Sequence, residues 1–257
     1  SECFDVLRKY QMRLNPDKCA FGVTSGKFLG FIVNKRGIEV NPDKIDAILE
    51  MVPPKNIKEL QRLTGRIVAL NRFMSKAGER CLPFFKALRK AKEFRWIDEC
   101  QEAFDKLKQY LTTPPVLTRT TAGEPLYLYL SASTGAISSV LIREEEGVQR
   151  PIYYVSRVLL DSETRYSEVE KIAYALVVAA RKLRPYFQAH TIRVLSNAPL
   201  RQVLHKPDTS GRLVKWSIEL GEFDIEYKPR PAIKGQVLAD FISELSLIHI
   251  SEPTRRS

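Results

Sequence analysis

The chain has 257 residues, of which 44% are hydrophobic and 28% are charged, and its formal net charge is +11. This length and composition suit one large or two small globular domains with real hydrophobic cores, and no low-complexity tract interrupts them. No uninterrupted apolar run reaches the roughly 20 residues that a membrane-spanning helix needs, so we expect no membrane partner.

The positive charge is concentrated in the first third of the chain. Residues 1–92 hold 19 Lys+Arg and 9 Asp+Glu, a net of +10, whereas residues 93–257 hold 22 and 21, a net of +1. A concentrated basic field favours a polyanionic partner, and nucleic acid is the leading candidate. The alternative is a solvated basic face that has no partner.

The four cysteines argue against a structural zinc site. They form no C-x-x-C pair, and no histidine stands near them at the spacing of a zinc ligand. Reduced thiols of this kind fit an intracellular protein. The residues are Cys3, Cys19, Cys81 and Cys100.

The first forty residues predict the end of an amphipathic helix followed by a β-meander. Residues 1–14 have helical spacing of apolar side chains. Strand-like segments follow at 19–23 and 27–33, separated by a turn at 24–26. A second tight turn at 34–37 carries Lys35 and Arg36, so the turns are basic.

Helices dominate the next seventy residues. Asn41-Pro42 predicts a helix start, because Asn is a favoured N-cap and Pro is tolerated at the first helical position. Asn56-Ile57-Lys58-Glu59 has the form of a capping box and begins a second helix with one basic face. Residues 83–92 predict a short basic helix, and Asp98 is expected to cap a further helix that ends before Pro114.

Residues 123–245 predict a mixed α/β sheet with flanking helices. The order of the elements is βββαβααβα, which is typical of a layered sheet domain. Strands are expected at 126–133, 136–143, 150–158, 191–196 and 223–228, and helices at 166–187, 199–205, 211–221 and 236–245.

This order and several motifs together resemble the Pol polyprotein of gypsy-type LTR retrotransposons, particularly the plant lineages, over about residues 4–245. The motifs are Arg13-Leu14-Asn15-Pro16-Asp17-Lys18-Cys19 with Phe28-Leu29-Gly30-Phe31, Asn41-Pro42-Asp43-Lys44-Ile45, Glu59-Leu60-Gln61-Arg62-Leu63-Thr64-Gly65, Phe94-Arg95-Trp96, Ala103-Phe104-Asp105-Lys106-Leu107-Lys108, Tyr153-Tyr154-Val155-Ser156-Arg157 and Arg165-Tyr166-Ser167-Glu168. The resemblance implies an α/β (α+β) fold in four parts. These are the end of a reverse transcriptase palm with a primer-grip-like hairpin at 1–40, a basic helical thumb at 41–92, a linker helix and connection at 93–122, and an RNase H-like domain with a mixed five-stranded sheet at 123–245.

The resemblance also implies metal-assisted hydrolysis in the second domain, where four acids hold two Mg²⁺ (or Mn²⁺) ions. Carried over position by position, these acids fall on Ser131, Glu170, Asn197 and Asp240. Two of the four are therefore neutral, and we expect no productively bound metal. The paired aspartates of the polymerase motif Tyr-x-Asp-Asp are absent, so we do not expect this chain to polymerise DNA alone.

Three hypotheses remain open. In the first, the chain holds a template–primer duplex, RNA·DNA or DNA, without reading its sequence, and the RNase H-like domain is a degenerate connection. In the second, that domain is an active RNase H whose metal ligands include Glu170 and Asp240, each of which taken alone is an ordinary surface acid. In the third, the chain is a domesticated nucleic-acid-binding protein. The predicted phosphate-contacting residues are Lys27, Lys35, Arg36, Lys58, Arg62, Arg66 and Arg72.

The ends of the chain suggest a fragment. The N-terminus is not a signal peptide and reads as a piece cut from a longer chain. Residues 246–257 depart from the family pattern and read as a non-native tail that we expect to pack poorly. The resemblance implies the remainder of the Pol polyprotein as a partner, and a cytoplasmic particle and then the nucleus as the location.

Overall fold

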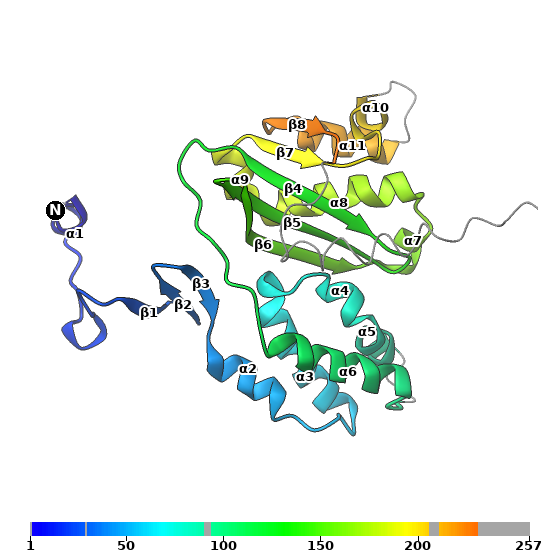
Figure 1. Ribbon diagram of the computed structural model, residues 1–257, viewed down its shortest axis with the longest axis horizontal. Helices are drawn as coiled ribbons and strands as arrows, with labels where there is room; N and C mark the ends of the chain where they lie inside the picture. Colours follow the sequence, from blue (N-terminus) through cyan, green and yellow to red (C-terminus); the bar gives the residue numbers. More distant parts are fainter. Residues whose placement is uncertain (1, 29, 90–93, 206–210, 231–257) are drawn as a thin grey trace, which may run out of the picture.

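The computed structural model describes residues 2–28, 30–89, 94–205 and 211–230. In this part of the chain, a small N-terminal sheet, a layer of helices and a larger sheet follow one another along the sequence (Figure 1). The predicted last helix, Asp240 and the tail 246–257 lie outside the described residues. No described helix is long and apolar enough to cross a membrane.

The N-terminal arm contains the predicted meander, but its strands are shifted. After α1 (Glu2–Lys9) and the short η1 (Pro16–Lys18), three antiparallel strands pair in the order β1-β2-β3. The predicted strand at 19–23 is wrong, because Phe21 and Val23 are exposed and no sheet covers them. The predicted strand at 27–33 is two strands, because Gly30 has a φ of +78° and turns the chain back. The strands are β1 (Ser25–Phe28), β2 (Phe31–Asn34) and β3 (Gly37–Val40).

Local capping explains where two of the helices begin. The Asn41 side chain accepts a hydrogen bond from the N–H of Asp43, and the Asn56 side chain accepts one from the N–H of Glu59, so both predicted N-caps are confirmed. The predicted cap at Asp98 is wrong, because Ile97 occupies the N-cap position and Asp98 lies in the first turn. The helices are α2 (Pro42–Leu49), α3 (Ile57–Leu70), η2 (Asn71–Phe73), α4 (Ala77–Arg80), α5 (Leu82–Arg89) and α6 (Asp98–Leu111).

The larger sheet has five strands in the order β6-β5-β4-β7-β8, which confirms the predicted mixed sheet. The first three strands are antiparallel, and β4, β7 and β8 run parallel to one another. The strands are β4 (Leu126–Ala132), β5 (Ala136–Glu145), β6 (Val148–Val158), β7 (Ile192–Leu195) and β8 (Ile225–Lys228).

The long helix predicted at 166–187 is two helices. The first ends at Lys182, with Leu183 as its C-cap, and Pro185 then stands in the first turn of the next helix. A proline has no N–H to continue the earlier hydrogen-bond ladder, which explains the break. The helices of this region are α7 (Asp161–Thr164), α8 (Glu168–Lys182), α9 (Arg184–Ala189), α10 (Leu200–His205) and α11 (Gly211–Leu220).

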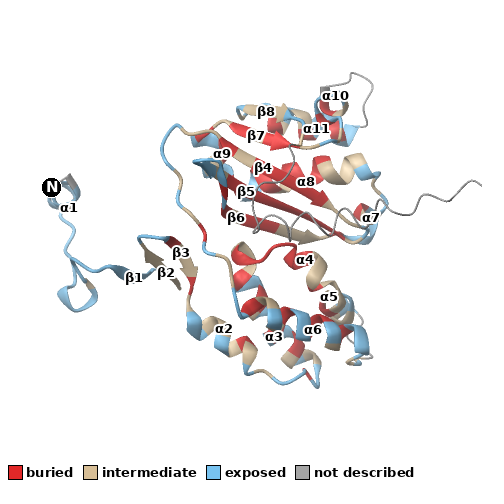
Figure 2. Cartoon of the chain, viewed as in Figure 1, coloured by how far each residue is buried: buried red, intermediate tan, exposed pale blue. Residues whose placement is uncertain are grey.

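Both faces of the larger sheet are covered (Figure 2). Leu126, Leu128 and Leu130 of β4 join the core that contains α8 and α11. Tyr129 of β4 points to the opposite face, because successive strand residues alternate. It joins a second core that also contains buried residues of α2 to α6, among them Leu63. The predicted thumb and linker helices therefore pack directly on the sheet and share one core with it.

Candidate functional site

A row of hydroxyl side chains crosses the sheet where the metal-binding centre was predicted. Ser131 of β4 is opposite Ser138 of β5, which is opposite Ser156 of β6. Ser131 shares the face of Tyr129, so the row faces the helical layer. Ser138 Oγ and Ser156 Oγ are 2.8 Å apart, and Ser156 Oγ accepts a hydrogen bond from the N–H of Gly78 in α4 at 2.8 Å. One end of the row is therefore bonded to the helical layer.

Asn197 continues this row on the other side of Ser131. The parallel register pairs Tyr129 with Leu195, so position 197 lies level with position 131, just beyond the end of β7. The side-chain oxygen of Asn197 accepts a hydrogen bond from the backbone N–H of Arg230 at 3.3 Å. The structure thus brings together the two positions where the predicted acids are replaced.

Glu170 is engaged by its own helix. It lies in the first turn of α8, and its carboxylate accepts hydrogen bonds from the N–H and Oγ of Ser167 at 2.9 and 3.0 Å. The other carboxylate oxygen is 3.4 Å from Nη2 of Arg212, whose guanidinium lies 4.0 Å from the centre of the Tyr166 ring. A metal ion would have to compete with a capping box and with an arginine for this carboxylate. Sequence reasoning missed Arg212, because only the fold brings α11 beside the start of α8.

The described residues do not fit a pair of Mg²⁺ ions. No group of three or more His, Cys, Asp or Glu side chains in this part of the chain could hold a metal. Magnesium prefers carboxylate oxygens, and a serine and an asparagine supply no negative charge to offset it. Of the four predicted acid positions, the described part of the chain has a carboxylate only at Glu170, and the carboxylate there is already bonded.

The seven predicted phosphate-contacting cations separate into two groups. Lys35, Lys58 and Arg62 are exposed and make no hydrogen bond or ion pair within the described residues. The other four make intramolecular contacts. Lys27 pairs with Asp43 and Arg36 pairs with Glu39, both at 3.0 Å. Arg66 donates a hydrogen bond to the carbonyl oxygen of Ala47. The Arg72 guanidinium lies 5.0 Å from the centre of the Phe31 ring and 4.7 Å from the centre of the Tyr153 ring.

Arg66 and Arg72 therefore have structural roles that the sequence pattern did not reveal. Arg66 ties α3 to α2, and Arg72 lies between the small sheet and β6 of the larger sheet. Arg72 Nε is also enclosed without a hydrogen-bond partner. These two arginines are half-buried and are engaged in contacts within the fold.

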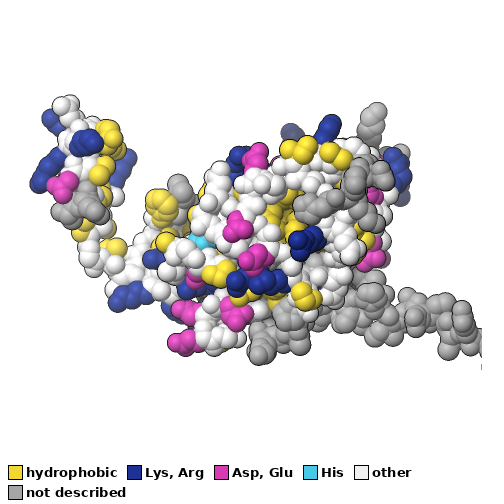
Figure 3. All heavy atoms as spheres, turned by 90° about the horizontal axis from the view of Figure 1, so that it is seen from above, with side chains coloured by type: hydrophobic (Ala, Val, Ile, Leu, Met, Phe, Trp, Pro, Cys, Tyr) yellow, Lys and Arg dark blue, Asp and Glu magenta, His cyan; other side chains and the backbone are white. Residues whose placement is uncertain are grey.

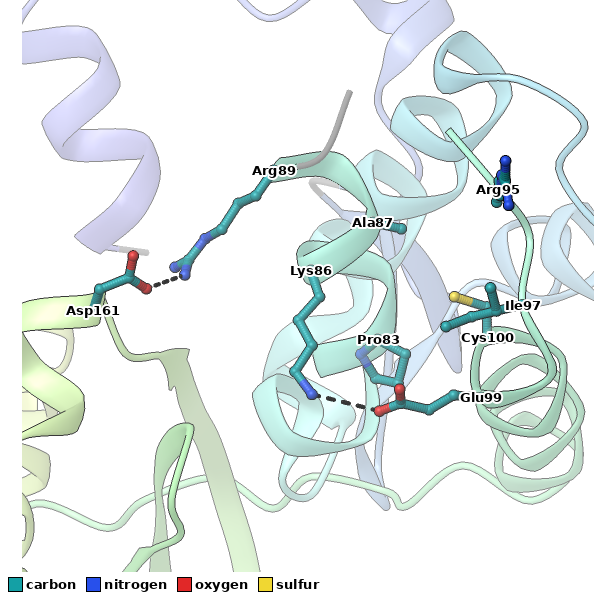
Figure 4. A pocket seen from close by; sticks show the side chains of 9 residues that line it. All are labelled: Pro83, Lys86, Ala87, Arg89, Arg95, Ile97, Glu99, Cys100 and Asp161. Carbon is teal, nitrogen blue, oxygen red and sulfur yellow. Dashed lines mark hydrogen bonds and ion pairs between the residues drawn. The ribbon is translucent and has the colours of Figure 1, made fainter. Parts of the chain in front are cut away.

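A pocket opens between α5, the start of α6 and α7 (Figure 4). Its cations are largely neutralised, because Lys86 lies 3.5 Å from Glu99 and Arg89 lies 2.8 Å from Asp161. Arg95 adds a further exposed cation at the rim. The pocket therefore contains ion pairs that join elements of the fold.

The N-terminal arm exposes apolar side chains among basic ones (Figure 3). A soluble surface rarely shows so many large hydrophobic residues on one short segment. They are Phe4, Val6, Tyr10, Met12, Leu14, Phe21, Val23 and Phe28.

Comparison with known proteins finds a family match in the middle of the chain. Residues 96–194 match the family model of the RNase H-like domain found in reverse transcriptase. The chain is 31% identical over 252 residues to the retrovirus-related Pol polyprotein from transposon opus of Drosophila melanogaster, which covers 93% of this chain and 25% of that polyprotein. It is 26% identical over 250 residues to the transposon Tf2-3 polyprotein of Schizosaccharomyces pombe, and the match covers 94% of this chain and 19% of that polyprotein.

Solved structures show the same fold. A foamy viral protease-reverse transcriptase (dRH) in complex with double-stranded DNA has a TM-score of 0.71 and 21% identity, covering 91% of this chain and 42% of that chain. The foamy viral protease-reverse transcriptase in complex with an RNA/DNA hybrid has a TM-score of 0.69 and 21% identity, and the match covers 85% of this chain and 31% of that chain. Residues 96–194 thus match an RNase H-like domain of reverse transcriptase, and most of the chain is similar to a segment of retrotransposon Pol polyproteins, as the resemblance predicted. It spans a quarter or less of the curated relatives named above.

Proposed function

We propose that this chain holds a nucleic-acid duplex by its phosphate backbone, as the thumb and connection of a retrotransposon reverse transcriptase. Its RNase H-like domain is then a scaffold rather than a nuclease. The foamy viral relatives of the same fold were solved with double-stranded DNA and with an RNA/DNA hybrid, which supports this class of partner.

The observation that carries the proposal is the orientation of α3. Its buried stripe, which includes Leu63 and Ile67, seats the helix in the core. Lys58 and Arg62 then face solvent one turn apart, and Gly65 continues the exposed face with no atom within 4 Å of the place of a Cβ. Two cations beside a flat, open glycine allow a charged backbone to approach closely. Contacts of this kind position a duplex without reading its sequence.

The neutral centre supports the scaffold role. Ser131 and Ser138 are enclosed, with exposed fractions of 4% and 5%, and the row ends in a hydrogen bond to α4. Cleavage by two metal ions needs carboxylates that can neutralise them. The part of the row formed by Ser131 and Ser138 therefore packs like an interior, and no step of hydrolysis is assigned to it.

Duplex binding as a function of salt tests the phosphate-holding role. The double substitution Lys58→Gln/Arg62→Gln should lower the slope of log K against log[salt] by about 0.9 for each contact removed. Lys106→Gln is the matched control, because Lys106 is also exposed but lies on α6 and pairs with Glu102 at 3.4 Å. A flat slope for the unmutated chain would end the proposal.

Cleavage of an RNA·DNA hybrid tests the scaffold role. We expect the unmutated chain to leave a labelled RNA strand intact in Mg²⁺ and in Mn²⁺. Cleavage that disappears in Asp240→Asn would instead support the active RNase H.

The exposed apolar residues of the N-terminal arm suggest that the remainder of a Pol polyprotein packs there in the intact protein.

A further inference from the structure

Arg230 lies beside the two positions where the predicted acids are replaced. Its backbone N–H bonds to Asn197, and its guanidinium carbon is 5.6 Å from the centre of the Tyr129 ring. Tyr129 is two residues before Ser131 on the same face of β4, and such neighbours are about 7 Å apart. A cation therefore lies next to the neutral row, at the end away from α4.

The guanidinium of Arg230 has no counter-charge within the described residues. Nε and Nη2 are enclosed and have no hydrogen-bond partner, while Arg230 as a whole residue is half-buried. Burial of the guanidinium lowers the pKa of Arg230. Taking a cation out of water without pairing it is costly, so a fold that keeps one is expected to offer it to an anion.

The chemistry of the site indicates which anion fits. A centre built of four carboxylates repels a phosphate unless metal ions stand between them. With Ser131 and Asn197 neutral and Glu170 paired with Arg212, the described residues of this place offer no free carboxylate, and Arg230 adds a positive charge. Arginine binds phosphate oxygens through its planar N–H groups, and the exposed Asn197 has a side-chain amide that can donate beside it.

We propose that Arg230 contacts a backbone phosphate of the bound duplex, so that the former metal centre holds nucleic acid through a fixed protein cation. This inference rests on the proposed duplex-holding function and names a contact outside the thumb. It would explain how an RNase H-like fold can contact a duplex at positions where two of the four predicted acids are replaced.

The test measures the affinity of the full chain for a short RNA·DNA hybrid at several salt concentrations. Arg230→Gln should weaken binding at low salt and lower the salt slope by about 0.9. Lys228→Gln is the local control, because Lys228 lies two residues away but already pairs with Glu226 at 2.9 Å, and it should change neither quantity. Urea unfolding should show Arg230→Gln to be at least as stable as the unmutated chain, because the substitution removes an enclosed charge.

Ser131→Asp provides a second variant that keeps the arginine. The new carboxylate would pair with Arg230 and occupy it, so duplex binding should fall as in Arg230→Gln. Combining the two substitutions should then cause no further loss of affinity.

The outcomes separate this inference from the proposed function. If Lys58→Gln/Arg62→Gln lowers the salt slope and Arg230→Gln does not, the Arg230 contact is refuted and the thumb contacts stand. If the unmutated chain shows no salt dependence, both fall. If inorganic phosphate stabilises the unmutated chain but not Arg230→Gln, while the duplex slope is unchanged, the site binds free phosphate and the duplex contact is refuted.

Discussion

Gly78 lies where α4 touches the larger sheet, and its substitution tests whether the thumb and the sheet form one body. A Cβ at position 78 would lie 2.9 Å from Ser156 Oγ, 3.1 Å from the carbonyl carbon of Arg157 and 3.2 Å from the nitrogen of Val158. Two of these atoms belong to the backbone of β6, so a rotamer change cannot relieve the overlap. Overpacking of this kind costs about 1–3 kcal/mol. The better helix propensity of alanine returns at most about 1 kcal/mol.

We therefore expect Gly78→Ala to lower the free energy of unfolding by up to about 2 kcal/mol, as the overpacking cost of about 1–3 kcal/mol less a gain in propensity of about 1 kcal/mol. Gly65→Ala is the matched control, because it also lies in a helix but has open space where the Cβ would be. That substitution should stabilise the chain by about 0.5–1 kcal/mol. Adding Ser156→Ala to Gly78→Ala should recover only part of the loss, since the two backbone contacts remain.

Urea unfolding of the full chain gives these differences from the midpoint and the slope. An unchanged slope would show that stability, rather than the compactness of the unfolded state, has changed. If Gly78→Ala is as stable as Gly65→Ala, α4 is not seated on β6 as described. The shared core of the two parts would then be refuted.

Three further predictions concern titration, thiols and capping. The Tyr174 hydroxyl donates to Glu163 Oε1 at 2.7 Å, and burial followed by this bond raises the pKa of Tyr174 to about 12. Since the unfolded value is about 10, this group contributes stability below about pH 10 that is lost as the pH rises to about 12. Tyr174→Phe should reduce the alkaline loss in urea midpoints, and an unchanged loss would refute the assignment. Burial raises the pKa of the Cys81 thiol to about 12, whereas Cys3 is exposed. Mass spectrometry after brief treatment with iodoacetamide should therefore find Cys3 modified and Cys81 unmodified. Rapid labelling of Cys81 would contradict its burial. Asn56→Ala should cost about 1 kcal/mol of unfolding free energy, and no loss would show that the α3 cap is dispensable.

The parts of the fold that depend on neighbouring residues could be predicted from the sequence. The caps at Asn41 and Asn56 use donors two or three residues away, and the five strands of the larger sheet have clear apolar patterns of their own. The predicted strand at 19–23 is wrong because, among the described residues, no strand or helix covers its apolar side chains Phe21 and Val23. The prediction of one helix at 166–187 is wrong because the apolar spacing continues across Pro185, whereas the backbone hydrogen bonds of the helix cannot continue there.

The site was harder to predict, because its contacts join residues that are distant in sequence. Arg66 reaches Ala47, and Arg72 reaches Tyr153, so neither contact appears in a helical pattern. The same is true of Arg212 beside Glu170 and of Arg230 beside Tyr129. Motif positions located Ser131 and Asn197, but only the register of β4 and β7 shows that they lie side by side.

The neutral row and the packing of the thumb depend on each other physically. Ser156 can accept the hydrogen bond from Gly78 because α4 lies directly on this face, and the same contact encloses Ser138. A carboxylate at an equally enclosed position would need a cation or several donors to offset its desolvation. At the other end of the row, Arg230 would supply such a cation. A return of acids to positions 131 and 197 would therefore pair them with Arg230 before they could bind a metal, so Ser131→Asp/Asn197→Asp alone should restore no hydrolysis of a hybrid. Cleavage by that double variant would show that the centre lacks only its acids, and would refute a role for Arg230 in keeping metal out.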